Sequence, residues 1–523
     1  MNTTEFLMVT SAVAPDRDAI VFEGQRITYM DLQLRSSKLA NALATLGVQK
    51  GDKVANIEVN TPNCVEAYFA CAKLGATYVP LNFRAKADEI AYMLQDSDAS
   101  VVLAGDRYIS TVEDIKGQIP NLKHLITHAD APDGWHSFDA LLDSGADEDP
   151  FTEIDDSDLT ILLFTAGTTG RPKGVMLAHQ NFSEYVLNNV SPVEPDVEEK
   201  NILTVPLYHI AGIQAVMAAV YGGRTIVLQR QFDPEDWMHL VQTEKVGRAM
   251  MVPTMLKQLM DHEKFKEFDL SSLKVITYGA ASMPLEVIKR AIRELPGTQF
   301  INAFGQTESA ATITMLSPED HNITGTPEEQ EIKLKRLGSI GKPLPDVEVK
   351  IMDEDGKRLL DVNEVGEIVA RGSRIMKGYW KQDAATSTTI DAEGWLHTGD
   401  LGYVDEEGYI FLAGRAKDMI KRGGEMVSPE AVENIILELD KVEDVAVIGV
   451  PDDEWGECVR AVIVPTKKGD PPTLDEVQKV CRARLASFMK PEDIVTVDEI
   501  PRNPMGKILK RVLREQFNQP ITA

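Results

Sequence analysis

A short apolar run followed by a stretch rich in glycine and threonine constrains the fold of this chain more than any other feature. Residues 159–164 read LTILLF, and residues 165–174 read TAGTTGRPKG. The first run is apolar on both faces and rich in residues that favour strands, which predicts a buried strand. The second run cannot extend that strand because three glycines interrupt it. The two runs together predict a strand that ends in a tight loop.

The composition of this loop indicates a phosphate-binding site. Glycine lets the backbone turn tightly and direct its N–H groups at an anion, while hydroxyl groups and a lysine add donors and positive charge. A Walker P-loop would need the lysine directly after its second glycine, and here Arg171 and Pro172 intervene. An ordinary surface turn can have the same composition, so the loop alone leaves both interpretations open. The residues expected to contribute are Thr165, Gly167, Thr168, Thr169, Gly170, Lys173 and Gly174.

Length and charge limit the class of protein. A chain of 523 residues is too long for one hydrophobic core, so we expect several domains. The net charge of −28 argues against nucleic acid or an anionic membrane as partner. The four cysteines have neither CxxC nor zinc-ligand spacing, and no stretch approaches the roughly 20 apolar residues of a membrane span. Because the first residues also lack a basic and apolar leader, we expect a cytoplasmic protein.

Helical and strand patterns alternate along the first half of the chain. Residues 27–46 carry leucines at helical spacing, residues 53–57 read as a strand, and residues 63–74 read as an apolar helix closed by Gly75. Residues 205–220 read as a strand end that turns into an apolar helix at His209. This alternation predicts an α/β fold with largely parallel sheets.

Two further loops follow predicted strands. Residues 274–284 read as a strand, a loop of small residues and a helix, and the loop contains Gly279, Ala280 and Ala281. A flat ligand can lie against such a backbone, although close packing of helix and strand would also explain a glycine there. Residues 299–308 end another strand at Thr307 and Glu308.

The last third of the chain predicts a boundary and a small domain. Residues 394–400 are expected to present Asp400 on a tight turn, and Arg415 follows at the end of the next segment. Ser428 and Pro429 begin a predicted helix, residues 445–450 and 460–464 read as strands, and residues 477–485 as a second helix. We therefore expect an α+β unit of about a hundred residues.

Five stretches in one order resemble the signature sequences of the acyl-adenylate-forming superfamily, which includes acyl-CoA synthetases, peptide-synthetase adenylation domains and beetle luciferases. They are residues 165–174, 274–284, 299–308, 394–418 and 501–510. Ala166 stands where many members carry a hydroxyl, and Phe304 stands where they carry tyrosine. The resemblance implies an α/β protein with a large adenylation domain of several subdomains, residues 1–416, and a small mobile α+β lid domain, residues 417–523.

The resemblance also implies roles for individual residues. Phe304 would stack on adenine and Thr307 would bind the α-phosphate. Glu308 and Thr165 would hold Mg²⁺, and Asp400 and Arg415 would bind ribose. The remaining contacts to adenine and the acyl group would come from Gly279, Ala280, Ala281, Asn302, Ala303 and Gly305.

The lid would contribute a lysine and a channel. By the resemblance, Lys507 would contact the carboxylate, ribose and α-phosphate, and Lys417 would be the hinge. Residues Gly423, Gly424 and Glu425 would face the site only after the lid rotates. His209 would lie beside the acyl pocket and thiol channel, where we assign it no proton-transfer role.

The resemblance implies an ATP-dependent acyl-CoA synthetase that uses Mg²⁺ and coenzyme A. Its partners would be small molecules, a medium- or long-chain or ring-bearing carboxylic acid among them, because several alanines suggest a roomy apolar pocket. Two alternatives are an acyl-AMP ligase that loads an acyl carrier protein and a non-catalytic adenylate-binding protein. The sequence leaves a homodimer open.

Overall fold

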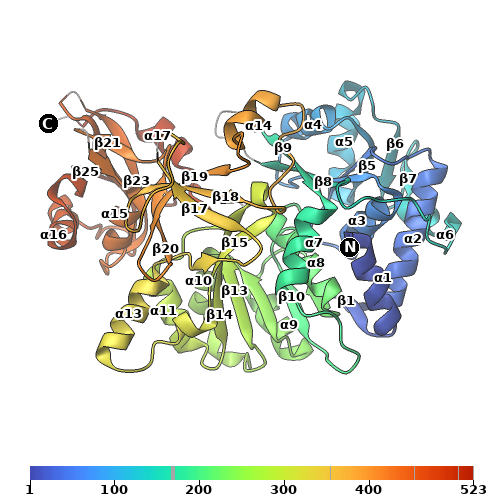
Figure 1. Ribbon diagram of the computed structural model, residues 1–523, viewed down its shortest axis with the longest axis horizontal. Helices are drawn as coiled ribbons and strands as arrows, with labels where there is room; N and C mark the ends of the chain where they lie inside the picture. Colours follow the sequence, from blue (N-terminus) through green and yellow to red (C-terminus); the bar gives the residue numbers. More distant parts are fainter. Residues whose placement is uncertain (166–170, 354, 424, 453, 504–505, 522–523) are drawn as a thin grey trace.

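The computed structural model describes residues 1–165, 171–353, 355–423, 425–452, 454–503 and 506–521. Its largest element is a nine-stranded sheet whose central strands are parallel (Figure 1). In order across the sheet the strands are β16 (Lys342–Pro343), β15 (Ala311–Leu316), β14 (Gln299–Gln306), β13 (Val275–Gly279), β12 (Arg248–Met251), β10 (Lys200–Leu203), β11 (Thr225–Leu228), β1 (Asp18–Phe22) and β2 (Gln25–Thr28).

A second large sheet has seven strands, and all but its last strand run parallel. It contains the predicted strands at residues 53–57 and 159–164, now β3 and β8. In order they are β7 (His136–Ser137), β6 (His124–Thr127), β5 (Ala99–Ala104), β3 (Lys53–Ile57), β4 (Thr77–Pro80), β8 (Leu159–Thr165) and β9 (Lys173–Ala178).

Helices connect the parallel strands, as the alternating pattern predicts. Twelve residues of α3 are buried, and one core cluster contains residues of α3, of α8 and of both sheets. Thr61 and Pro62 start α3, and Gly75 ends it with a φ of 70°. The helices before the third sheet are α1 (Thr3–Val13), α2 (Tyr29–Thr45), α3 (Pro62–Leu74), α4 (Ala87–Asp96), α5 (Ile109–Ile115), α6 (Phe138–Ser144), α7 (His179–Asn189), α8 (Ile210–Tyr221), α9 (Pro234–Glu244), α10 (Pro253–Asp261), α11 (Leu285–Glu294), α12 (Pro318–His321) and α13 (Pro327–Leu337).

A third, antiparallel sheet follows, and α14 (Asp383–Thr389) lies between two of its strands in sequence. The expectation that Asp400 sits on a tight turn is wrong, because Asp400 lies within a strand and pairs with Arg415. The positive φ of Gly399, 73°, bends that strand locally without ending it. The strands are β17 (Glu348–Met352), β18 (Gly366–Arg371), β19 (Leu396–Val404) and β20 (Ile410–Arg415).

The C-terminal residues form the small α+β unit that the sequence predicts, at one end of the molecule (orange to red in Figure 1). Two core clusters on the β23 and β24 pair contain only residues from Ile420 onward, so this unit has a core of its own. Its elements are β21 (Ile420–Arg422), β22 (Glu425–Val427), α15 (Pro429–Ile436), β23 (Val442–Asp452), β24 (Gly456–Pro465), α16 (Leu474–Arg484), β25 (Asp493–Thr496) and α17 (Lys510–Phe517). Within the described ranges, none of the helices is long and apolar enough to cross a bilayer.

Candidate active site

The candidate site lies where the carboxyl ends of both parallel sheets meet. Ligands of open α/β sheets bind beyond the carboxyl ends of the strands, at a point where the strand order reverses. The chain reverses between β10 and β12, because β11 lies on the far side of β10. The segments that carry the signature residues follow the carboxyl ends of β8, β10, β13 and β14.

The predicted phosphate loop is described only at its edges. Thr165 ends β8, and Lys173 begins β9 directly opposite it. The predicted residues Gly167, Thr168, Thr169 and Gly170 lie outside the described residues. Gly174 is packed closely, since a Cβ there would come 3.0 Å from Leu162 Cδ1. The strand is therefore where the sequence predicts it, and the structure adds β9 as a return strand.

The small residues after β13 and β14 are fixed by backbone contacts. A Cβ on Gly279 would lie 2.1 Å from the carbonyl oxygen of Ala303, and one on Gly305 would lie 1.6 Å from that of Ala311. Side chains at either glycine would separate the strands. Three alanines here have positive φ angles, 66° at Ala280, 48° at Ala310 and 82° at Ala311. Such angles are strained for alanine, and strain of this kind gathers at functional sites.

The Asn302 to Glu308 stretch forms the end of β14 and a short 3-10 turn, Thr307–Ser309. Asn302 donates to the carbonyl oxygen of Ser339 at 3.4 Å, and Ala303 is buried. Phe304 is half-buried against a cluster that includes Ile313 and Ile340. The turn places Thr307 and Glu308 side by side beyond the strand end.

Glu308 is held by a tyrosine that sequence reasoning missed. The Tyr379 hydroxyl donates to Glu308 Oε1 at 2.8 Å, and the amide of Met376 donates to the Glu308 carbonyl oxygen at 2.9 Å. The Lys173 ammonium lies 4.7 Å from the centroid of the Tyr379 ring. Among the described residues, no cation forms an ion pair with Glu308. Its charge is therefore left for a ligand.

Asp400 is held by cations instead. Arg415 Nε lies 2.8 Å from Asp400 Oδ1, and the two residues are paired across β19 and β20. Asp400 is only 6% exposed. Burial raises the pKa of this carboxyl above its usual range, and the nearby charges of Arg415 and Lys507 offset part of that rise.

Lys507 reaches the same place from the C-terminal unit. Burial lowers the pKa of Lys507 to about 8, with a further lowering by Arg415 that Asp400 opposes. The main chain around it is fixed, because the Asn503 side chain accepts from the Lys507 amide at 2.9 Å. Arg502 binds both carboxylate oxygens of Asp444 at 2.8 Å and anchors this segment to β23. The structure thus brings Lys507 of the C-terminal unit close to Asp400 and Arg415, which pair within the third sheet.

Two contacts hold the C-terminal unit against the large domain in this arrangement. Gly506 has a φ of 76° and passes so close to α10 that a Cβ would lie 2.6 Å from Thr254 Oγ1. Ser282 donates to Glu430 Oε1 at 3.0 Å, from the loop after β13 to the first turn of α15. Lys507 is therefore presented by a docked domain.

Of the other predicted lid residues, Lys417 lies near these groups, because its charge acts on both Asp400 and Lys507, whereas Gly423 and Glu425 make no described contact with them. Gly423 and Glu425 are exposed, and Gly423 has a φ of 58° and donates to the carbonyl oxygen of Trp455 at 2.8 Å. Lys417, the predicted hinge, is exposed in the turn between β20 and β21. The predicted Gly424 lies outside the described residues.

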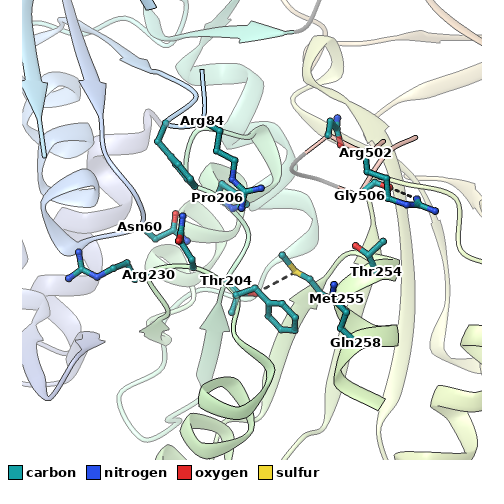
Figure 2. A pocket seen from close by; sticks show the side chains of 14 residues that line it. Asn60, Arg84, Thr204, Pro206, Arg230, Thr254, Met255, Gln258, Arg502 and Gly506 are labelled. Carbon is teal, nitrogen blue, oxygen red and sulfur yellow. Dashed lines mark hydrogen bonds between the residues drawn. The ribbon is translucent and has the colours of Figure 1, made fainter. Parts of the chain in front are cut away.

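A cavity of about 280 Å³ opens between the large domain and the lid beside Gly506. Figure 2 shows Arg84, Arg230 and Arg502 around it, with Thr204 directly after β10 and Thr254 in the first turn of α10. His209 follows β10 and begins α8. Burial lowers the pKa of His209 to about 3, so its ring is neutral at physiological pH, and its Nε2 is buried without a described partner. His209 is not among the residues that line this cavity, so its predicted place beside an acyl pocket stays a prediction.

The donor set fits a magnesium ion bound together with a nucleotide. Mg²⁺ is held by one or two carboxylates plus phosphate oxygens more often than by an all-protein cage. The described residues contain no cluster of three or more histidine, cysteine or acidic side chains suited to a metal. Glu308 offers a carboxylate without a cationic partner among the described residues, which suits a Mg²⁺ ion held by a carboxylate together with phosphate oxygens.

Tyr379, Thr254, Ser282 and Glu430 are the site residues that sequence reasoning missed. Each acts through a contact with a residue far away in the chain. Only the aromatic pair in Lys377-Gly-Tyr-Trp380 could have drawn attention to Tyr379.

Comparison with known proteins agrees with this geometry. The family model of the AMP-binding enzyme matches residues 8–380, and that of the AMP-binding enzyme C-terminal domain matches residues 431–507. A feruloyl-CoA synthase of Amycolatopsis is 34% identical over 97% of this chain and 97% of its own length. The long-chain-fatty-acid–CoA ligase FadD13 of Mycobacterium tuberculosis is 32% identical over 95% of this chain and 94% of its own.

A solved structure extends the match to three dimensions. The o-succinylbenzoate CoA synthetase of Bacillus subtilis, in complex with its acyl-adenylate intermediate, superimposes with a TM-score of 0.83 at 30% identity. The match covers 98% of both chains. These findings confirm the resemblance and the fold class: the chain belongs to the AMP-binding enzyme family, among relatives that are CoA ligases.

Proposed function

We propose that this protein is an AMP-forming acyl-CoA synthetase whose reaction is organised by Lys507, Asp400 and Arg415. A carboxylic acid and ATP would give an acyl-adenylate and pyrophosphate, and coenzyme A would then accept the acyl group with release of AMP. The observation that carries the proposal is the meeting of Lys507 from the docked lid with the Asp400–Arg415 pair of the large domain. The family and its CoA ligase relatives support the same reaction class.

In the first half-reaction the chain must position two anions and spread their charge. A carboxylate oxygen attacks the α-phosphorus of ATP, and the bond to the bridging oxygen of pyrophosphate breaks. Lys507, Thr307 and the loop at residues 165–174 would supply donors to the phosphates, and Asp400 would accept from the ribose hydroxyls. Bound Mg²⁺, held by Glu308 with Thr165, would screen the triphosphate charge.

The second half-reaction needs access for a thiol. The thiolate attacks the acyl carbonyl, and AMP leaves with the electron pair. Lys507 is not required for this step, so the lid can move away about Lys417 and bring the segment at residues 423–425 toward the site. The CoA ligases among the named relatives support coenzyme A as acceptor. Of the three arginines that line the cavity beside Gly506, Arg230 and Arg502 are already paired with Glu23 and Asp444.

The acid is proposed as medium- or long-chain or ring-bearing. Small side chains at Ala280, Ala281 and Ala303 would leave room for such an acid beside the strand ends. The named relatives act on both kinds of acid, feruloyl in one case and long-chain fatty acyl in the other. The alternative of loading an acyl carrier protein also stays open, because one relative is named a fatty acid–acyl-carrier-protein ligase.

A cytoplasmic location is part of the proposal. All four cysteines are free thiols, as a reducing compartment would leave them. A homodimer stays a prediction, as does the boundary at residues 416 and 417.

Release of pyrophosphate and AMP from Mg-ATP across a panel of acids, with and without coenzyme A, tests the proposal. The panel should grade chain length and ring content. We expect one class of acid to give AMP only when coenzyme A is present. Pyrophosphate that appears once per enzyme and then stops, even with coenzyme A, would point to a carrier protein. No pyrophosphate with any acid would contradict the adenylation itself.

A further inference from the structure

The main chain around Tyr379 is joined to the strand that leaves the phosphate loop. Residues 377–380 lie between β18 and α14 and pair with β9. The amide of Met176 donates to the Gly378 carbonyl oxygen at 3.0 Å. The amide of Trp380 donates to the Gly174 carbonyl oxygen at 2.8 Å. The position of Tyr379 is therefore tied to the position of Lys173, which begins β9.

The side chain of Tyr379 joins this strand to Glu308. Its hydroxyl donates to Glu308 Oε1 at 2.8 Å, and its ring lies 4.7 Å from the Lys173 ammonium. The residue is 7% exposed, and its amide donates to Thr386 Oγ1 at 2.9 Å. With little exposed surface and contacts on several sides, the ring has few alternative positions.

A phenol placed between an acid and a cation leaves both charges available for ligands, whereas a direct ion pair would not. If Glu308 and Lys173 bound one another directly, each would neutralise the charge that the other needs for its ligand. The phenol holds the carboxylate by a neutral hydrogen bond and the ammonium by the face of its ring. Both charges keep their positions and remain available for a metal ion and a phosphate.

A second tyrosine, Tyr409, also lies between a carboxylate and a lysine, but there the carboxylate is not left free for a ligand. The Tyr409 hydroxyl donates to Asp320 Oδ1 at 2.8 Å, and Lys342 lies 4.5 Å from the Tyr409 ring centroid. There, however, Asp320 already forms an ion pair with Arg336 at 3.3 Å. Tyr409 therefore provides a matched control whose carboxylate is already paired.

We infer that Tyr379 is a positioning residue, which sets Glu308 and Lys173 at a fixed separation before Mg-ATP binds. The inference rests on the proposed function, because it deepens the account of the same site. It assigns the hydroxyl to the carboxylate and the ring to the lysine. The two parts of one side chain can therefore be tested separately.

Calorimetric titration of ATP without any acid, in the presence and absence of Mg²⁺, tests this inference. Tyr379→Phe removes only the hydroxyl, so we expect it to weaken Mg-ATP binding about five- to tenfold and to leave metal-free ATP binding unchanged. Tyr379→Leu also removes the ring, so metal-free ATP should bind several-fold more weakly as well. Tyr409→Phe should bind both forms as the wild type does.

Three results would overturn the inference. Tyr379→Phe could bind Mg-ATP as tightly as the wild type, or lose affinity equally with and without Mg²⁺. Tyr409→Phe could match Tyr379→Phe, which would mark a general effect of losing a tyrosine–carboxylate bond. If the wild type bound no Mg-ATP at all, the proposed function would fail first and the inference with it, so the two failures are distinguishable.

Discussion

Glu308 and Asp400 are two carboxylates of one site that are held by opposite kinds of partner. Glu308 accepts from the neutral hydroxyl of Tyr379, whereas Asp400 lies against the guanidinium of Arg415 and in the field of Lys507. A neutral donor orients a carboxylate without cancelling its charge, and that leaves the charge for a metal ion. Cationic partners cancel the charge and leave oxygens that accept hydrogen bonds. The kind of partner thus agrees with the proposed roles, Glu308 as a metal ligand and Asp400 as a ribose ligand.

The largest expected effect comes from removing the cation that joins the lid to Asp400. Lys507→Ala should lower the rate of ATP–pyrophosphate exchange by about two to three powers of ten, because it removes charge stabilisation from adenylation alone. Conversion of supplied acyl-AMP to the thioester should stay near the wild-type rate. Both rates are measured on the same preparation. An equal loss in both half-reactions would contradict the division of labour.

Neutralising Glu308 tests the other side of the comparison. Glu308→Gln keeps an oxygen that can accept from Tyr379 but removes the charge, so we expect adenylation to fall by about two powers of ten and to require more Mg²⁺. Asp400→Asn should weaken ATP binding without moving the Mg²⁺ dependence. The Mg²⁺ concentration needed for half-maximal ATP–pyrophosphate exchange, measured at saturating ATP, distinguishes the two variants. The same Mg²⁺ dependence in both variants would remove the distinction between the two carboxylates.

The lowered pKa of Lys507 predicts how adenylation depends on pH. The lysine is charged below its pKa of about 8 and loses the charge as pH rises through that value. We therefore expect kcat/KM of adenylation to fall about tenfold per pH unit above pH 8. Below pH 8 the lysine is charged, so this group should cause no loss of rate there. Lys507→Ala should retain only a low rate without this falling limb. A wild-type profile that stays flat to pH 10 would show that the lysine charge does not govern the step.

The smallest expected effect concerns the contact that docks the lid. Ser282→Ala removes the hydrogen bond to Glu430, which should lower the equilibrium constant for docking by up to about fivefold, since such a bond contributes about 1 kcal/mol. Adenylation should slow by at most that factor, and thioester formation should not slow. Ser271→Ala is the matched control, because its hydroxyl donates to Asp269 within the large domain. Equal slowing of both half-reactions by Ser282→Ala would contradict a docking role.

Local patterns were enough for much of the fold and part of the site. The spacing of apolar residues predicted α3, α8, α15 and the strands β3 and β8, because burial of one face imposes the period of each element. Thr307 and Glu308 also follow the end of β14, where the sequence predicts a strand end. Asp400 was placed on a turn in error, because two glycines next to a charge are typical of turns and give no sign of the partner strand.

The sequence by itself determined the α/β class, the order of the loops that carry chemistry and the separate C-terminal unit. Those features depend on residues that are near in the chain and on the need to bury apolar faces. Only the tertiary structure decided that Tyr379 holds Glu308, that Arg415 and Lys507 surround Asp400, and that Thr254 receives Gly506. Such pairings depend on how the two parallel sheets and the C-terminal unit pack together. Contacts between segments that are distant in the chain produce no repeating pattern in the sequence, so they cannot be predicted from it.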